Sequence, residues 1–480
     1  MRHEDTHAMP YPLRFSDKRE AAEFIFQNNI RIVNLCHIPE DAKLKTLSFS
    51  ATDRKRVKEI LELGERADGS SLFSFIEPGR SDIYIQPNLE KAFIHPFSAL
   101  PTLNVLCNYF DEDGKPLTIS PQNALMRGED RLNTSCDLTL RAFAELEFYI
   151  ISKLETEPTF QGPTDRNYHD SMPFSKFENL RNEALSILEE LGIPTKYAHS
   201  EVGRIPGNNA TIEQHEIEFA AQNLADTGEA VTIGKWVIRN VCAKHGTQVS
   251  FSPKVSVDHA GTGMHIHLCA LRDKHNVIST AEGRLSDEAM EMMGGILRFA
   301  PSLAAFANPT PVSYLRFIAR KESPMHICWS ARNRLALIRV PLWWTHVNKT
   351  GEAENCRETF EYRAPDAFAN PYLLLAGITI AARYGMTNSR KSMDLAETLR
   401  AEASGSSMKK FGVLPRSCEE SARELQKDRK HYEEGGVFPE ILINKIISKL
   451  ESCKDEKLWQ TLAEKPERFE SLLKEYLHYG

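Results

Sequence analysis

The chain of 480 residues lacks three features that would place it in a specialised class of protein. Its nine cysteines include no C-x-x-C pair, which argues against a zinc knuckle or a disulfide framework and predicts the reduced thiols of a cytosolic protein. Its 59 basic residues do not outnumber its 66 acidic residues, so the formal charge of −7 disfavours a general nucleic-acid binder. The longest strongly apolar stretch, from Leu373 to Ala382, covers about half of a bilayer. We therefore expect a soluble, cytoplasmic protein that binds neither nucleic acid nor a membrane.

A change of composition around residues 111 to 137 divides the chain into two parts. From Arg31 to Tyr109, short β-rich runs are separated by turn signals such as Asp68–Ser71, which predicts a small mixed sheet. From about residue 138 onwards, strand-like and helix-like segments alternate. We expect an N-terminal domain over residues 20–112 and a larger domain over residues 120–480.

Acidic residues recur with the spacing of a β-strand in two segments. Residues 143–150 alternate with period two, so a strand places Glu145 and Glu147 on the same face. Two neighbouring carboxylates repel each other unless a cation lies between them. A second acidic segment contains Glu201 and Glu216, with turn signals between them. A solvent-exposed strand face would explain either segment by itself.

Two further segments place polar residues on a single face of a predicted strand, two histidines in one and an acid with an arginine in the other. The glycines at positions 261 and 263 allow the backbone to approach a ligand closely, and His265 and His267 follow on one strand face. Such a pair can ligate a metal, although ordinary core or surface roles are more common for two histidines considered alone. Residues 359–363 again read as a strand, with Glu361 and Arg363 on one face.

Four arginines, Arg316, Arg332, Arg334 and Arg339, lie in apolar sequence, where guanidinium groups usually meet buried anions. The carboxylates and imidazoles suit Mg²⁺ or Mn²⁺ better than zinc. The arginines suit phosphate or carboxylate groups. This inventory is compatible with several metal-dependent phosphoryl transfers, and composition and spacing do not choose among them.

At these residues the chain resembles the glutamine synthetase family. Seven motifs occur in the family's order between about residues 24 and 450: Asp68–Ser71, Ala144–Phe148, Gln214–Glu216, Gly261–His265, Asn308–Arg316, Ser330–Arg334 and Glu361–Tyr372. The resemblance implies an α+β fold, with an N-terminal β-grasp domain and a C-terminal catalytic domain on a curved antiparallel sheet with flanking helices. It also implies a homo-oligomeric double ring with active sites between adjacent subunits.

The resemblance further implies ATP and two or three Mg²⁺ or Mn²⁺ ions as cofactors. The implied metal ligands form two sets, which are Glu147, Glu201 and Glu216 for one ion and Glu145, His265 and Glu361 for the other. The residues implied for the nucleotide phosphates are His267, Arg334 and Arg339. Those implied for the amino-acid substrate are Gly261, Arg316 and Arg363. An ammonium pocket would combine Tyr168, Glu201 and Glu322 with Asp68 of a neighbouring subunit. Asp68, Glu322 and Arg334 are the implied catalytic residues, and Glu322 would shield the intermediate from water.

The implied activity is an ATP-dependent carbon–nitrogen ligase that forms glutamine from glutamate and ammonia through γ-glutamyl phosphate, a step of nitrogen metabolism. Two departures from the family pattern bear on the acceptor: Ala260 stands where an Asn is expected, and the interval from Glu201 to Glu216 is longer than usual, which predicts an enlarged loop. A γ-glutamyl ligase for an organic amine or polyamine is therefore an alternative. A catalytically silent structural or regulatory relative is a second alternative, although all six implied metal ligands are present.

Overall fold

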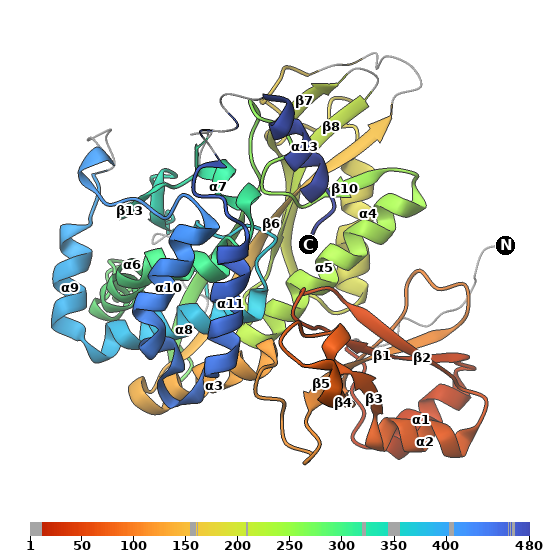
Figure 1. Cartoon of the computed structure of the whole chain (residues 1–480). Coiled ribbons are helices and arrows are strands. Elements are labelled where there is room, and N and C mark those ends of the chain that lie inside the picture. The colour runs from red at the N-terminus through yellow and green to blue at the C-terminus, as the bar shows by residue number, and fades with distance from the viewer. Residues whose placement is uncertain are drawn as a thin grey trace.

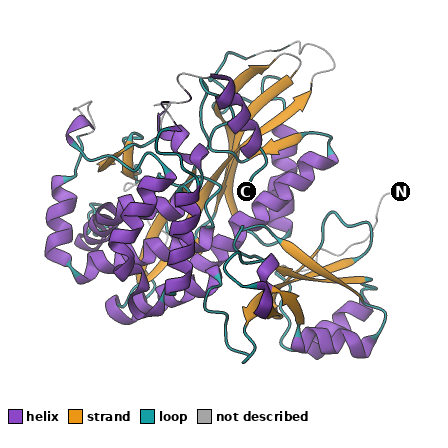
Figure 2. Cartoon of the chain, viewed as in Figure 1, coloured by secondary structure: helices purple, strands orange, loops and turns teal. Residues whose placement is uncertain are grey.

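The computed structural model describes residues 12–153, 160, 162–207, 210–318, 323–343, 356–402, 408–458, 460, 462 and 466–480. Two β-sheets, each with its own helices, organise these residues (Figure 1 and Figure 2). The α+β class expected from the sequence is confirmed. Within the described ranges, we find no helix whose length and apolar character would let it cross a membrane.

The N-terminal part is a mixed five-stranded sheet with two helices. The strand order is β2 (Lys45–Ser50), β1 (Ile32–His37), β5 (Thr102–Phe110), β4 (Asp82–Ile94) and β3 (Glu65–Asp68). Only β1 and β5 run parallel. Helices α1 (Lys18–Gln27) and α2 (Arg54–Leu63) begin at the side-chain caps Asp17 and Asp53. Their apolar sides share a buried cluster with Val33, Leu103 and Val105 of the sheet, as expected of a β-grasp domain.

The larger part is built on a ten-stranded sheet whose long strands curve through the domain (Figure 2). Its main path is β13–β14–β15–β11–β6–β8–β7, and only β13 and β14 pair in parallel. The strands are β6 (Thr139–Lys153), β7 (Thr195–Gly207), β8 (Ala210–Phe219), β9 (Gln222–Asn223), β10 (Gln248–Ser250), β11 (Met264–Arg272), β12 (His275–Asn276), β13 (His326–Ala331), β14 (Ala336–Val340) and β15 (Phe360–Tyr362).

Helices flank this sheet and form most of its core. They are α3 (Pro121–Cys136), α4 (Glu178–Glu190), α5 (Leu224–Lys244), α6 (Asp287–Ala307), α7 (Pro311–Ile318), α8 (Pro371–Thr387), α9 (Ser389–Thr398), α10 (Cys418–Glu433), α11 (Glu440–Ser452) and α13 (Pro466–Tyr476). The apolar stretch from Leu373 to Ala382 lies in α8 and is buried. Helices α6 and α8 approach so closely that a Cβ on Gly295 would lie 2.1 Å from the Ala381 carbonyl oxygen.

One expectation about the cysteines is wrong. Cys269 and Cys356 form a disulfide across 87 residues of sequence, with their Cα atoms 5.8 Å apart. Cys269 lies in β11 and Cys356 shortly precedes β15, and the pairing of these two strands brings the cysteines together. A C-x-x-C search cannot detect such a pair, because the contact depends on long-range strand pairing. The other seven cysteines are free, as expected.

Candidate active site

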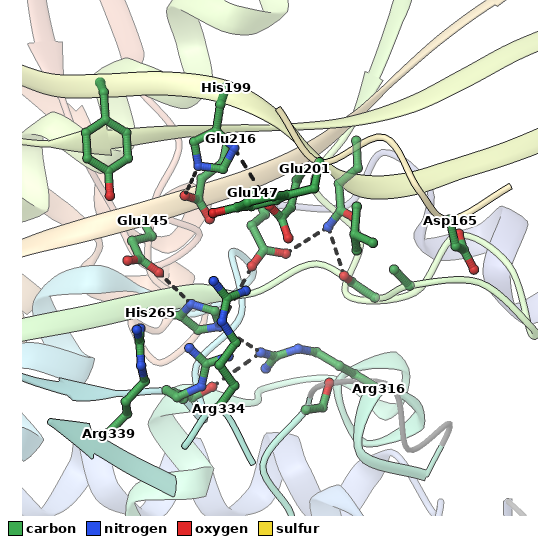
Figure 3. Close-up of a pocket in the computed structure, with 18 residues that line it drawn as sticks. Glu145, Glu147, Asp165, His199, Glu201, Glu216, His265, Arg316, Arg334 and Arg339 are labelled. Atoms are coloured by element: carbon green, nitrogen blue, oxygen red, sulfur yellow. Dashed lines mark hydrogen bonds and ion pairs between the residues drawn. The ribbon is translucent and has the colours of Figure 1, made fainter. Parts of the chain in front are cut away.

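A cavity of about 640 Å³ opens over the middle of β6, β7 and β8 and the start of β11, and it faces α7 and the segment before β14. The sequence-predicted site residues that line it are Glu145, Glu147, Tyr168, Glu201, Glu216, Gly261, His265, Arg316, Arg334, Arg339 and Arg363. Figure 3 shows the carboxylates on one side of this cavity and Arg316, Arg334 and Arg339 on the other, with His265 between them. The cavity thus sets acidic groups opposite cationic ones.

Strand register explains why acids that are distant in sequence converge. On the β6–β8 ladder, Glu147 lies opposite Glu216 and Glu145 lies opposite Glu218. On the β6–β11 ladder, Glu145 lies opposite His265. Directly opposite residues on neighbouring strands share a sheet face. The acids that alternate along each strand therefore form one acidic surface across the sheet. That surface lies in a cavity rather than in open solvent.

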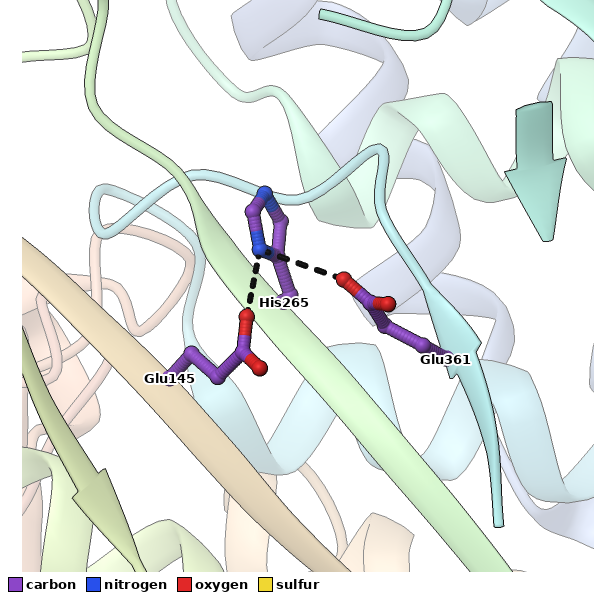
Figure 4. A group of neighbouring side chains, drawn as sticks. All are labelled: Glu145, His265 and Glu361. Carbon is purple, nitrogen blue, oxygen red and sulfur yellow. Dashed lines mark hydrogen bonds and ion pairs between the residues drawn. The ribbon is translucent and has the colours of Figure 1, made fainter. Parts of the chain in front are cut away.

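One cluster combines two carboxylates and an imidazole (Figure 4). The Nδ1 atom of His265 lies 2.7 Å from Oε2 of Glu145 and 3.4 Å from Oε1 of Glu361. One atom from each residue can be chosen so that all three lie within 4.8 Å of one another. Glu361 is fully buried. Oxygen ligands with one imidazole nitrogen suit a hard divalent cation.

Polar contacts from His199 and Gln214 connect the second set of acids. The Nε2 atom of His199 lies 3.1 Å from Oε1 of Glu216, and Nδ1 lies 3.7 Å from Oε2 of Glu201. The amide of Gln214 donates to Oε2 of Glu147 at 2.8 Å. Glu218 adds a further buried acid, since its carboxylate can approach those of Glu145 and Glu216 closely enough to share an ion.

The acids shift each other's protonation strongly. Burial, followed by repulsion from neighbours such as Glu145 and Glu147, raises the pKa of Glu216 well above its usual range. Burial would also raise the pKa of Glu145, but the imidazoles of His267 and His265 hold it well below its ordinary value. For Glu361, the Arg363 guanidinium outweighs burial and lowers the pKa. A site in which carboxylates compete for protons and cations suits a divalent metal, which would neutralise them together.

A β-bulge in β7 positions Glu201. Ser200 pairs with His215 and Arg204 with Glu213, so residues 201–203 of β7 lie opposite Gln214 alone. The Gly203 amide donates to Oε1 of Gln214 at 3.0 Å, and a Cβ there would lie 2.1 Å from the Tyr149 hydroxyl. The bulge therefore requires glycine at this position.

In the described residues, most of the long interval between Glu201 and Glu216 is paired strand, contrary to the enlarged loop expected from the sequence; residues 208 and 209 lie outside the described residues. Beyond the bulge, β7 and β8 continue as a paired hairpin from Arg204 to Gly207 and from Ala210 to Glu213. The strands continue because Ile205 pairs with Ile212, and Arg204 is buried where its guanidinium donates to the Phe174 carbonyl at 3.0 Å. The extra residues thus lengthen the sheet beside the cavity.

Guanidinium groups form the opposite wall. Arg316, on α7, is held by the Ala364 carbonyl at 2.9 Å, and its Nη2 atom lies 3.3 Å from Nε2 of His265. Arg339 contacts Glu361 at 2.9 Å, and Arg363 contacts the same carboxylate. Arg334 lies over the ring of Tyr168, with 5.7 Å from Cζ to the ring centroid. These groups can bind phosphate or carboxylate oxygens.

Three expected site residues do not line this cavity, and a fourth lies outside the described residues. His267 is buried behind the cavity, stacked on Phe143 at 4.4 Å, and its Nε2 atom lies 2.9 Å from Oε1 of Glu145. Glu361 likewise lies behind the lining residues. Asp68 is exposed on the N-terminal domain and does not line the cavity of its own chain; the hydroxyls of Ser71, Ser70 and Ser81 lower its pKa. Glu322 lies outside the described residues.

Sequence reasoning missed five residues of the cavity wall: Asp165, Tyr197, His199, Val202 and Ser323. His199 lies two residues before Glu201, and its register partner on β8 is Glu216. The i, i+2 spacing of His199 and Glu201 was visible in the sequence and is the same signal that identified Glu145 with Glu147.

Comparisons with known proteins point to one family. The glutamine synthetase catalytic-domain model matches residues 118–472, and the glutamine synthetase β-grasp-domain model matches residues 29–112. Glutamine synthetase of Aquifex aeolicus is 31% identical over 415 residues, covering 80% of this chain and 85% of the relative. Glutamine synthetase of Thermococcus kodakarensis is 32% identical over 393 residues, covering 81% and 83%.

Solved structures agree with this result. A cryoEM structure of Plasmodium falciparum glutamine synthetase matches with a TM-score of 0.77 at 20% identity, over 92% of this chain and 96% of that one. The apo structure of GmaS matches with a TM-score of 0.74 at 20% identity, over 92% and 96% of the two chains. At this identity the two structures support the fold alone.

Proposed function

Because the chain belongs to the glutamine synthetase family, we propose that it forms glutamine from glutamate and ammonia, using ATP and a γ-glutamyl phosphate intermediate. A ligase of the glutamine synthetase type is what the relatives support, and ATP and divalent metals are general in the family. The relatives do not determine the acceptor or the intermediate, so ammonia and γ-glutamyl phosphate are the parts that we propose.

The observation that carries the proposal is the cavity wall itself. Buried carboxylates and His265 face a set of arginines across one space of about 640 Å³. The donor set fits Mg²⁺ or Mn²⁺, with Glu145, His265 and Glu361 as ligands of one ion and Glu147, Glu201 and Glu216 as ligands of the other. Such ions, when bound, neutralise the charge of the phosphates that are being transferred.

The remaining residues bind and orient the substrates. Arg316 and Arg363 would hold the carboxylates of glutamate, since both guanidinium groups line the cavity beside Gly261. Arg334 and Arg339 would contact the phosphates, and His267 would orient Glu145 from behind. The arginines stabilise negative charge as the γ-phosphoryl group passes to the glutamate side chain.

Ammonia then attacks the γ-carbonyl carbon of the acyl phosphate and displaces phosphate. Only neutral ammonia is a nucleophile, so acids that hold NH₄⁺ and accept its proton assist this step. Tyr168 and Glu201 both line the cavity, and Asp68 of a neighbouring subunit would complete the pocket. In that arrangement the active site lies between subunits of a homo-oligomer.

Phosphate release with MgATP, L-glutamate and ammonium tests this function. We expect turnover with the natural chain and a large loss in Asp68→Ala, because that variant removes a carboxylate from the ammonium pocket. Asp113→Ala is the matched control, since Asp113 is exposed in the turn directly after that domain and its carboxylate pairs with Lys115 at the surface. Equal turnover of the two variants would contradict the placement of Asp68, and no turnover with any acceptor would contradict the function.

A further inference from the structure

Two of the sequence motifs contain buried polar residues to which the proposed reaction assigns no role. Asn308 directly follows α6 and begins the motif that ends at Arg316, and Asp366 lies in the motif that begins at Glu361. The side chains of Asn308 and Asp366 are fully buried, and neither is among the described residues that line the active-site cavity. A buried polar group is costly unless it is hydrogen-bonded, so its partners indicate what it holds in place.

The segment 363–366 presents three consecutive backbone carbonyls to one guanidinium group. Nη1 of Arg316 donates to the Ala364 carbonyl at 2.9 Å and to the Pro365 carbonyl at 3.2 Å. Nη2 donates to the Arg363 carbonyl at 3.3 Å. Because both protons of Nη1 are bound by backbone oxygens, the direction of the Arg316 guanidinium depends on the course of this turn.

Asn308 and Asp366 fix the course of the turn. The Asn308 amide donates at 2.9 Å to the Ala364 carbonyl, the same oxygen that accepts from the guanidinium, and at 3.0 Å to Oδ2 of Asp366. Oδ1 of Asp366 accepts from the Phe368 amide at 3.0 Å. The backbone amide of Asp366 donates to the Ala307 carbonyl at 3.2 Å. Both residues therefore tie the turn to the end of α6.

Asp366 also supplies negative charge near a buried cation. Arg316 is only 4% exposed, and a buried guanidinium is costly unless an anion lies near it. Burial lowers the pKa of Arg316, and the carboxylates of Glu147 and Asp366 oppose this effect. Glu147 is one of the acids proposed to bind metal, so a bound cation would offset its charge. Asp366 would then remain to balance Arg316.

We propose that Asn308 and Asp366 are positioning residues for Arg316, and through it for a carboxylate of the glutamate substrate. The inference rests on the proposed function, because it requires Arg316 to bind glutamate. With Nη1 held by the turn, the rest of the guanidinium is presented to the substrate in a fixed direction, which a planar pairing with carboxylate requires.

Asp366→Asn tests this role with the smallest change, because it keeps the shape of the side chain and removes its charge. We expect KM for glutamate, in phosphate release with MgATP and ammonium, to rise by about tenfold or more, since the binding group is displaced. KM for ATP should change by less than about twofold, and kcat at saturating glutamate should fall far less than kcat/KM.

Asp428→Asn is the matched control. Asp428 is a buried carboxylate that pairs with Arg298 and Ser302 between α10 and α6, and it is not among the residues that line the cavity. Both variants should lower the midpoint of thermal unfolding, because each alters a buried hydrogen-bond network. Only Asp366→Asn should raise KM for glutamate.

Exchange of the two side chains tests whether they act together. Asn308→Asp alone places two carboxylates side by side and should raise KM for glutamate more than Asp366→Asn does. The double variant, Asn308→Asp with Asp366→Asn, restores one charge and one amide–carboxylate hydrogen bond. Its KM should therefore lie below that of Asn308→Asp, and a KM equal to the product of the two separate effects would contradict a shared role.

An unchanged KM for glutamate in Asp366→Asn, with turnover intact in the natural chain, would overturn the positioning role and leave the proposed function standing. An equal rise in Asp428→Asn would also overturn it, because the effect would then be a general loss of packing. If Asp366→Asn does not fold, Ser313→Ala removes one hydrogen bond to the same carboxylate, and it should raise KM by about threefold or the role is wrong. Absence of glutamate-dependent phosphate release by the natural chain would overturn both proposals.

Discussion

The imidazole of His199 joins two acids of the cavity, with Nε2 lying 3.1 Å from Oε1 of Glu216. Its Nδ1 atom contacts the Ser200 carbonyl at 3.0 Å, which fixes the ring, and lies 3.7 Å from Oε2 of Glu201. His199 therefore acts as a positioning residue for carboxylates proposed to bind metal, and such supporting contacts determine how tightly a metal site binds.

His199→Ala should weaken activation by Mg²⁺ or Mn²⁺ by about tenfold or more, because Glu216 loses the contact that orients it. Activity measured against metal concentration gives this value, and His199→Gln should restore part of it. His245→Ala is the control, since His245 is 41% exposed at the end of α5 and contacts only Glu183. Identical metal dependence in the two alanine variants would rule out the positioning role.

Divalent metal should stabilise the protein, because it relieves repulsion among the buried carboxylates. Saturating Mn²⁺, at about 100 times its Kd, would add about 2.7 kcal/mol to the free energy of unfolding. The midpoint of thermal unfolding should therefore rise with Mn²⁺ and rise much less in Glu145→Gln. Glu90→Gln, an exposed acid of the N-terminal sheet, should keep the full increase. An equal increase in both variants would place the metal elsewhere.

A buried lysine should contribute a positive slope to the pH dependence of stability above neutral pH. Lys235, on α5, is fully buried and donates from Nζ to the Ala367 carbonyl at 2.9 Å; burial lowers its pKa to about 7 from 10.5. The unfolded chain holds the proton up to pH 10.5, so between about pH 7 and 10.5 it binds more protons than the folded chain. This group therefore makes folding more favourable as pH rises through that window and opposes it fully below pH 7.

Lys235→Met should remove up to about 1.4 kcal/mol per pH unit from the slope of the unfolding free energy in this window. Denaturant unfolding at pH 7, 8 and 9 measures the slope. Lys244→Met, near the end of the same helix and exposed, is the control. If the slope is the same in all three proteins, Lys235 is charged in the folded state.

The disulfide between Cys269 and Cys356 predicts how many cysteines a thiol reagent can label. After unfolding without reductant, a thiol reagent should label seven cysteines, and after reduction it should label all nine. Peptide mapping of the unreduced protein should recover the two segments linked. Nine reactive thiols without reductant would show that this pair is reduced, as the sequence alone predicted.

The sequence identified most residues of the candidate site, but it did not show how the fold brings them together. Alternation alone placed Glu145 with Glu147 and His265 with His267, because strand parity is a local property. Their convergence depends on the register of β6 with β8 and β11, which parity does not determine. The resemblance to a known family supplied that missing information.

Two features remained out of reach for physical reasons. The bulge at residues 201–203 changes which side chains of β7 face the cavity, and nothing in the local pattern except Gly203 marks it. The contact between Cys269 and Cys356 depends on the pairing of β11 with β15, which are far apart in sequence. Both arise from tertiary structure, which local periodicity cannot report.

Transfer of the γ-phosphoryl group to the glutamate side chain is the central claim, and isotope transfer measures it directly. With L-glutamate carrying ¹⁸O in its γ-carboxylate, MgATP and ammonium, the released phosphate should contain one ¹⁸O atom per product molecule, because an oxygen of the side chain leaves with phosphate. Phosphate that contains no ¹⁸O, released alongside glutamine, would contradict an acyl phosphate intermediate and the roles assigned to the arginines that face the acidic wall.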